Sequence, residues 1–458
     1  MVRIRQSIAR VLVMLLLLAT VSALGGIAQA QNQATPMATP GASPAASPTV
    51  PAAQRDYEAA PAPSSPVVWV ELGPDGAQIA RAITGASGCP SLTIDGASQP
   101  MQTRVAPGAD FAVTVCEMTI PNGTTNADVN GQKLHLLSGT PTRVAVIGDT
   151  GCRLAKPSAY QGCDDPSLWP FATIAQQLAA WQPDLIIHVG DYYYREDPCP
   201  AGNSICAGSP TGDTWASWNA DFFTPAASLL PAAPWIFIRG NHETCERGGD
   251  GWFHFLDPRP MPPSCQTYTD PYAIPVGDVQ LLVFDSSAAS DGSAPEDQVT
   301  EYSKELAAMA QLAGQNAWFL THRPIWGPVQ FGANRTLAIG NATLRAASGN
   351  TLPDGVQLSL AGHIHLAEVL SFPPGSGRPP MFIVGNTGTE LDAPMSVNLT
   401  GLDIDGVPVA SGRTVSAFGY LTLESTSGAW MATAHDANAA PFWACAVLAK
   451  TAACAPAP

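Results

Sequence analysis

The chain has 458 residues, of which 46% are hydrophobic and 13% charged, and its formal net charge at pH 7 is −16. This length suffices for one large domain and a smaller one. The acidic balance argues against nucleic acid or an anionic membrane as a long-range partner, although a pocket that holds cations would override it locally.

Residues 1–30 have the features of a secretory signal peptide. Three arginines and no acid precede an apolar run, and Ala28-Gln29-Ala30 has the small-x-small pattern of a cleavage site. An uncleaved anchor is the alternative, since the apolar run is slightly long. Cleavage would remove three positive charges and change the net charge from −16 to −19. No later stretch is apolar enough to span a bilayer, so we expect a secreted or extracytoplasmic protein, free or held at the cell surface.

Two regions precede the main domain. Residues 31–65 are dominated by Ala, Pro, Ser, Thr and Gln, which is typical of a disordered linker. Residues 66–141 contain short apolar or alternating runs separated by turn-forming residues, with no convincing helix between them. These runs cover residues 67–72, 91–94, 111–120 and 133–139. They predict a small β-sandwich of fibronectin or immunoglobulin type.

The pattern changes at residue 142, where apolar strand-like runs begin to alternate with helical stretches. The predicted strands cover residues 143–149, 184–191, 235–241, 279–285, 317–322, 356–363, 381–386, 416–425 and 429–437. The predicted helices cover residues 171–181, 214–223, 297–313 and 336–348. This alternation predicts an α/β domain with a mixed sheet over residues 142–440, followed by a C-terminal tail, 441–458, with a disulfide.

Ten cysteines in an exported chain indicate disulfide bonds. Proximity along the sequence favours bonds between neighbours. The expected pairs are Cys89–Cys116, Cys152–Cys163, Cys199–Cys206, Cys245–Cys265 and Cys445–Cys454. No two cysteines have the CxxC spacing of a thiolate metal site.

Five polar residues directly follow strand-like runs, namely Asp149, Asp191, Asn241, His322 and His363. Ligands of α/β sheets gather at the carboxyl ends of strands, so we expect these side chains to converge. Neighbouring glycines allow the sharp turns that this requires. Carboxylate, amide and imidazole groups suit iron, zinc, manganese or nickel. The ligands are too many for one tetrahedral ion, whereas two ions roughly 3.5 Å apart could share a bridging aspartate.

Five motifs occur in order along the chain: GDTG at 148–151, GDYYY at 190–194, GNHE at 240–243, THRP at 321–324 and GHIH at 362–365. The series resembles the calcineurin-like metallophosphoesterase superfamily and, within it, the purple acid phosphatase branch. That branch is indicated by the Asp-Thr-Gly of the first motif in place of Asp-x-His, and by Tyr194 three residues after Asp191. The resemblance implies the metallophosphoesterase fold, a mixed-sheet β-sandwich flanked by helices.

The resemblance also implies the site. It gives an iron-type site of Asp149, Asp191, Tyr194 and His365, and a divalent site of Asp191, Asn241, His322 and His363. The ions would be Fe(III), favoured by a Tyr194 phenolate that would colour the protein, and a divalent iron, zinc or manganese ion. Asp191 would be the bridge. His242 would contact the phosphate and assist the leaving group.

The implied function is the hydrolysis of small phosphomonoesters by metal-hydroxide attack on phosphorus. Asp191 and His242 are the expected catalytic residues, and Asn241, His242 and Arg323 the expected substrate contacts. One departure from the family matters. Purple acid phosphatases usually carry further histidines shortly after the motif of His322, whereas residues 323–335 contain none. Arg323, Gln330 and Arg335, which could contact substrate instead, are poor proton donors.

Several alternatives stay open. A phosphodiesterase or nucleotidase could use the same metals, and the chain could be a cell-surface binding protein on a phosphoesterase scaffold. Tyr194 follows Tyr192 and Tyr193 and could simply pack in the core. We expect His188 to be a core or outer-sphere histidine and Glu243 to orient a neighbouring group or turn.

Overall fold

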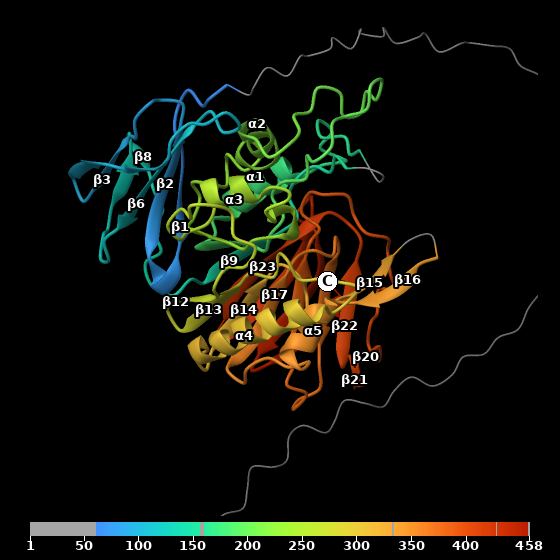
Figure 1. The fold of residues 1–458 in the computed structure, drawn as a ribbon. Helices are drawn as coiled ribbons and strands as arrows, with labels where there is room; N and C mark the ends of the chain where they lie inside the picture. Colours follow the sequence, from blue (N-terminus) through green and yellow to red (C-terminus); the bar gives the residue numbers. More distant parts are fainter. Residues whose placement is uncertain (1–60, 156–159, 332–333, 427, 457–458) are drawn as a thin grey trace, which may run out of the picture. The chain divides into compact units, whose positions relative to one another are not determined.

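The structure is a computed structural model that describes residues 61–155, 160–331, 334–426 and 428–456 (Figure 1). The signal peptide predicted for residues 1–30, and the linker up to residue 60, lie outside the described residues. Two sheets of eleven and seven strands contain most of the strands. Within the described ranges, no helix has the length and apolar character that a membrane crossing requires.

The eleven-stranded sheet joins the C-terminal strands, the first strands of the α/β region and the N-terminal region. In spatial order it contains β26 (Thr451–Pro456), β25 (Pro441–Leu448), β24 (Ala429–Asp436), β23 (Gly419–Thr426), β9 (Arg143–Ile147), β10 (Leu185–His188), β11 (Trp235–Phe237), β1 (Val67–Leu72), β2 (Gln78–Thr84), β6 (Thr114–Ile120) and β5 (Gln102–Val105). Strands β9, β10 and β11 are parallel. The expected C-terminal tail thus supplies two strands, and its disulfide links them.

The seven-stranded sheet contains β12 (Tyr272–Val276), β13 (Val279–Phe284), β14 (Ala317–Thr321), β17 (Val356–Ala361), β19 (Met381–Val384), β18 (Ala367–Ser371) and β22 (Ser411–Val415). Its strands β13, β14, β17 and β19 are parallel. Two hairpins stand apart from it, β15–β16 (Pro328–Phe331 and Thr336–Ile339) and β20–β21 (Asp403–Ile404 and Val407–Pro408). A four-stranded sheet near the N-terminus contains β4 (Ala97–Pro100), β3 (Ser91–Ile94), β7 (Ala127–Val129) and β8 (Gln132–Lys133).

The two large sheets pack face to face and helices cover their outer faces. Val146 and Ile187 of one sheet meet Leu320 and Leu360 of the other in a buried apolar core. Helices α1 (Phe171–Trp181), α2 (Trp215–Trp218) and α3 (Gly249–Phe255) contribute to the core on one outer face, and α4 (Glu296–Leu312) and α5 (Ala342–Ser348) to the core on the other. Parallel strands that are buried on both faces appear in the sequence as continuous apolar runs. The strands of this core could therefore be predicted from the sequence. The predicted mixed-sheet sandwich with flanking helices is confirmed.

The N-terminal region is all-β, as expected. However, one of its sheets continues by hydrogen bonding into the domain that was predicted to begin after residue 141. Its two sheets enclose an apolar cluster that includes Val70, Leu92 and Val129. Strand β1 also pairs in parallel with β11, Glu71 opposite Trp235. The boundary at residue 141 stays a prediction, and the sheet itself is continuous across it.

The helices differ from the prediction in three places. The helix expected over 214–223 is α-helical only at Trp215–Trp218 and continues as a π-helix, Asn219–Phe223. The helix expected over 336–348 divides into β16 and α5, because Gly340 turns the chain with a φ of 39° and the Asn341 side chain caps α5 at Leu344 N. The short helix α3 was not predicted, since two of its seven residues are glycine. All five predicted disulfides are confirmed.

Candidate metal centre

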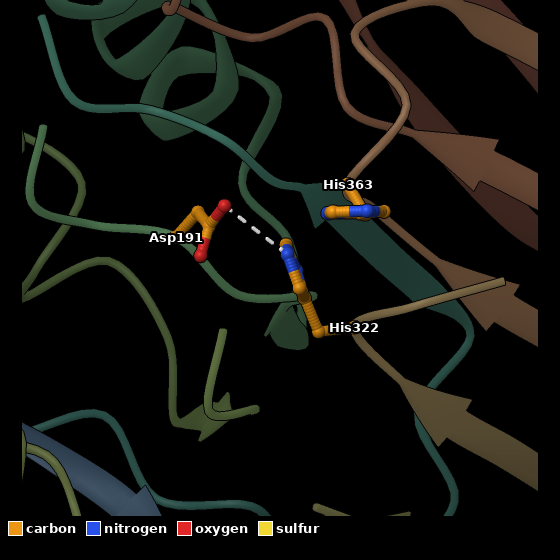
Figure 2. A group of neighbouring side chains, drawn as sticks. All are labelled: Asp191, His322 and His363. Atoms are coloured by element: carbon orange, nitrogen blue, oxygen red, sulfur yellow. Dashed lines mark ion pairs between the residues drawn. The ribbon is translucent and has the colours of Figure 1, made fainter. Parts of the chain in front are cut away.

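The loops after five parallel strands bring together the polar residues that follow them. Asp149 follows β9, Asp191 follows β10, Asn241 follows β11, His322 follows β14 and His363 follows β17. Asp191, His322 and His363 offer ligand atoms that all lie within 4.8 Å of one another (Figure 2). These side chains therefore converge, as expected from their positions at strand ends. Three of them follow strands of the eleven-stranded sheet and two follow strands of the seven-stranded sheet.

The backbone at three of these residues adopts a conformation that is rare outside glycine. The φ angles are 55° at Asp149, 61° at Asp191 and 71° at His363. The neighbouring glycines serve mainly to allow close approach. A Cβ on Gly240 would lie 2.0 Å from Asp191 Oδ1, and one on Gly362 would lie 2.5 Å from Asp149 Oδ2. The carboxylates thus occupy space that only glycine leaves free.

One set of donor atoms surrounds the Tyr194 hydroxyl. Its oxygen lies 3.0 Å from Asp149 Oδ1, 2.9 Å from Asp191 Oδ2 and 3.1 Å from His365 Nε2. Tyr194 and Asp149 are fully buried. Burial and the two carboxylates raise the pKa of Tyr194 well above its ordinary value. The buried cluster of two acids around one phenol has the chemistry of a cation site.

A second set of donor atoms meets the first at Asp191. The oxygen Oδ2 that faces Tyr194 also lies 3.1 Å from His322 Nε2. His322 Nε2 lies 3.0 Å from Asn241 Oδ1, and the opposite ring nitrogen donates to the carbonyl of Val189 at 2.8 Å. Burial disfavours the charged imidazole, but the Asp191 carboxylate outweighs it and raises the pKa of His322 to about 9.

His363 completes this second set and has close charged neighbours. Its Nε2 lies 3.0 Å from Asp291 Oδ2 and 3.0 Å from Arg323 Nη1, and these two groups form an ion pair. Arg323 does not line the cavity described below. Its contacts therefore give no support to the predicted binding of substrate.

His242 lies against Tyr194, with their ring centroids 3.8 Å apart. Its Nδ1 is 2.9 Å from Glu196 Oε1, and Arg247 pairs with the same carboxylate. Burial lowers the pKa of His242 to about 4, although Asp191 opposes this shift. The predicted catalytic histidine thus belongs to a cluster with Glu196 and Arg247, two residues that the motifs did not reveal.

Glu243 and His188 both lie near the second motif, and they have different roles. Glu243 accepts hydrogen bonds from the backbone of Asp191 and Tyr192, at 3.1 and 2.9 Å, which holds the second motif loop in place. His188 is fully buried, with Nε2 2.9 Å from the Thr150 hydroxyl. It is therefore an interior histidine rather than part of either donor set.

A cavity of about 590 Å³ lies beside the proposed metal ligands. Among the residues that line it are Asp191, Asn241, His242, His363 and His365. Its cationic residues are Arg153, Arg247 and Arg345, and it is also lined by Asp291 and Asp392. The remaining wall is largely apolar and contains Pro324, Val329, Ala338, Ile339, Ala342 and Ile364. The cavity therefore has groups for an anion and apolar surface for an apolar group.

Comparison with known proteins agrees with this geometry. Residues 142–367 match the calcineurin-like phosphoesterase family. The chain contains a calcineurin-like phosphoesterase domain. This domain holds all seven predicted ligands and the neighbours Glu196, Arg247, Asp291 and Arg323. No match was found among curated proteins.

The phosphoesterase fold extends over most of the chain. A similar structure is purple acid phosphatase PPD1 from seeds of yellow lupin (Lupinus luteus), with a TM-score of 0.54 at 12% identity over 86% of this chain and 74% of that one. A structure of PhoD is also similar, with a TM-score of 0.52 at 11% identity over 87% of this chain and 94% of that one. At these identities the likeness concerns the fold.

Proposed function

We propose that the chain is an extracytoplasmic phosphomonoesterase that uses two metal ions. The observation that carries this proposal is the position of Asp191 Oδ2, which lies 2.9 Å from Tyr194 Oη and 3.1 Å from His322 Nε2. One carboxylate oxygen thus faces both donor sets, as a bridging ligand must. Five disulfides support a location outside the cytoplasm.

The donor atoms divide naturally between two ions. Asp149, Tyr194 and His365 would hold the first, and Asn241, His322 and His363 the second, with Asp191 shared. A phenol and two carboxylates suit Fe(III), whereas an amide and two imidazoles suit divalent iron, zinc or manganese. Such ions, when bound, polarise the phosphoryl group and lower the pKa of water, which makes a nucleophile available at neutral or acidic pH.

The remaining residues of the cavity would bind and orient the ester. Arg153 and Arg247 line the cavity and would offset the charge of the phosphate. His242, held by Glu196, would donate a hydrogen bond to the phosphate or to the leaving oxygen. Among the described residues that line the cavity, His242 is the only imidazole outside the two donor sets. Acid assistance of the leaving group therefore depends on His242 or on solvent.

Metal analysis, a visible spectrum and two substrates test the proposal. We expect two ions per chain, about one of them iron with a violet band, and faster hydrolysis of p-nitrophenyl phosphate than of its bis ester. Asp191→Asn should lose both metal content and hydrolysis. Unchanged metal content and activity in this variant would contradict a shared ligand, and an inactive wild-type protein would favour a binding protein.

A phosphodiesterase is the second candidate, because the cavity of about 590 Å³ has apolar lining residues besides the proposed ligands and so offers room for a second ester group. Preference for bis-p-nitrophenyl phosphate would favour it over the monoesterase.

A further inference from the structure

The three histidines of the donor sets are held in two different ways. His322 and His365 each donate from Nδ1 to a backbone carbonyl, that of Val189 at 2.8 Å and that of Glu390 at 2.7 Å. A carbonyl can only accept, so Nδ1 carries the proton and Nε2 is free to ligate. In His363 the engaged nitrogen is Nε2 instead, 3.0 Å from Asp291 Oδ2.

Asp291 is itself held from two sides. Its Oδ2 pairs with Arg323, whose backbone N–H donates to the Ser286 hydroxyl at 2.9 Å. Its Oδ1 accepts from Asn341 Nδ2 at 2.8 Å, and Asn341 is also the N-terminal cap of α5. The carboxylate thus has a fixed position although its side chain is 40% exposed.

Nε2 of His363 is engaged by Asp291 and Arg323, which points to Nδ1 as the metal-binding atom. If Nε2 carries a proton, it donates to Asp291, and if it does not, it accepts from Arg323. Only the first arrangement leaves a lone pair on Nδ1. Among the described residues, the cluster with ligand atoms within 4.8 Å comprises Asp191, His322 and His363, without Asp291. Asp291 therefore acts through His363.

We propose that Asp291, fixed by Arg323 and Asn341, is a positioning residue that makes His363 an Nδ1 ligand of the second ion. A carboxylate that accepts from the far nitrogen of a ligating histidine fixes its tautomer and ring orientation and raises its basicity. Arg323 offsets the charge that Asp291 adds to the cavity. This inference rests on the proposed two-ion site, and it assigns Arg323 a role different from substrate binding.

The test is a calorimetric titration of the metal-stripped full-length protein with Zn²⁺. We expect two binding events in the wild type. In Asp291→Asn and Asp291→Ala, one affinity should fall about 10–100-fold while the other changes little, because His363 is the one proposed metal ligand that Asp291 contacts. Arg323→Met should weaken the same event by a smaller factor.

The matched control is Glu301→Gln. Glu301 pairs with Lys304 at 2.9 Å, its side chain is also partly exposed, and neither residue lines the cavity. Both affinities should be unchanged in this variant. Wild-type affinities in both Asp291 variants, or equal loss at both events, would overturn the inference. Fewer than two events in the wild type would instead contradict the proposed function. Thermal unfolding of each metal-free variant checks that the fold is intact.

Discussion

The Tyr194 hydroxyl lies within hydrogen-bonding distance of three other proposed ligands, and the ring is fully buried against His242. The two tyrosines before it have other tasks: Tyr192 donates to the carbonyl of Ile238 at 3.0 Å and Tyr193 to that of Arg195 at 2.9 Å. Of three consecutive tyrosines, only the third thus points its oxygen at the carboxylates. Packing alone would not require that geometry.

Replacing Tyr194 with phenylalanine should separate the two ions. The ring that packs on His242 stays, so the fold should persist, but the phenol oxygen is lost. We expect the violet band to disappear and the iron content to fall, with uptake of the divalent ion retained. Absorption spectroscopy and metal analysis of the purified variant measure this. A band of unchanged position and intensity would remove Tyr194 from the ligands.

His242 gives a second prediction at this scale. General acid assistance contributes about 10²–10⁴-fold, and most where the leaving group is a poor one. His242→Ala should therefore lower kcat on an alkyl phosphate by about 10²-fold or more, and on p-nitrophenyl phosphate by much less. Glu196→Gln should show the same pattern in weaker form. An equal loss on both substrates would assign His242 to phosphate binding alone.

At the scale of elements, the β15–β16 hairpin forms part of the cavity wall. Val329 from β15 and Ala338 and Ile339 from β16 line the cavity with apolar atoms. A wall of this kind suits the apolar part of a leaving group, because contact removes its surface from water. The hairpin therefore offers apolar contact to a bound ester.

Ile339→Asp tests this role of the hairpin. Introducing a charge into the wall should lower kcat/KM for phenyl phosphate about 10-fold, the scale of one or two lost apolar contacts, and leave methyl phosphate little changed. Leu337 is the matched control, because it lies in the same strand, is 45% exposed and does not line the cavity. Equal effects of Leu337→Asp and Ile339→Asp would show that the charge acts non-specifically.

Helix α4 carries a buried acid that gives a prediction about pH. Glu305 is 4% exposed, and burial, with Asp285 and Glu301 nearby, raises the pKa of its carboxyl to about 8. The folded protein then binds a proton that the unfolded chain releases near pH 4.5. This group therefore reduces stability as pH rises from 4.5 to about 8. Glu305→Gln should raise the Tm at pH 8 and change it little at pH 4. A Tm difference that does not depend on pH would contradict the assignment.

For the whole molecule, the sequence revealed those parts of the site that local patterns specify. Five of the proposed ligands could be predicted because they directly follow apolar strands, and Tyr194 and His365 were added by the resemblance of the motifs to a known family. The structure brings all seven together. Glu196, Arg247 and Asp291 could not be predicted, since they lie on irregular loops and reach the histidines only through the tertiary fold. In contrast, Asn341 is a typical N-cap residue, so the start of α5 could have been predicted from the sequence.

The N-terminal region shows a second limit of the sequence. Its strands could be predicted from their alternation, but the single parallel bridge from Glu71 to Trp235 leaves no mark in either segment. Buried charged residues lie near this contact between the N-terminal region and the phosphoesterase domain, which we call the seam. Arg81 pairs with Glu71 and donates to the carbonyl of Asp257 at 3.0 Å. Arg104, which pairs with Glu117 at 2.9 Å, also donates to the carbonyl of Phe253 at 2.8 Å. The N-terminal sheets are thus tied to the phosphoesterase domain.

Removing Arg81 should therefore destabilise the whole protein and not only its first strands. The side chain is fully buried, so Arg81→Met leaves Glu71 charged or protonated without its partner, at a cost of about 3 kcal/mol. We expect one cooperative urea transition at a lower midpoint, followed by fluorescence and circular dichroism together. The exposed pair of Lys304 and Glu301 is the control, where Lys304→Met should change little. Two separate transitions would show that the N-terminal sheets unfold independently, and the seam would then contribute little to the stability of the active domain.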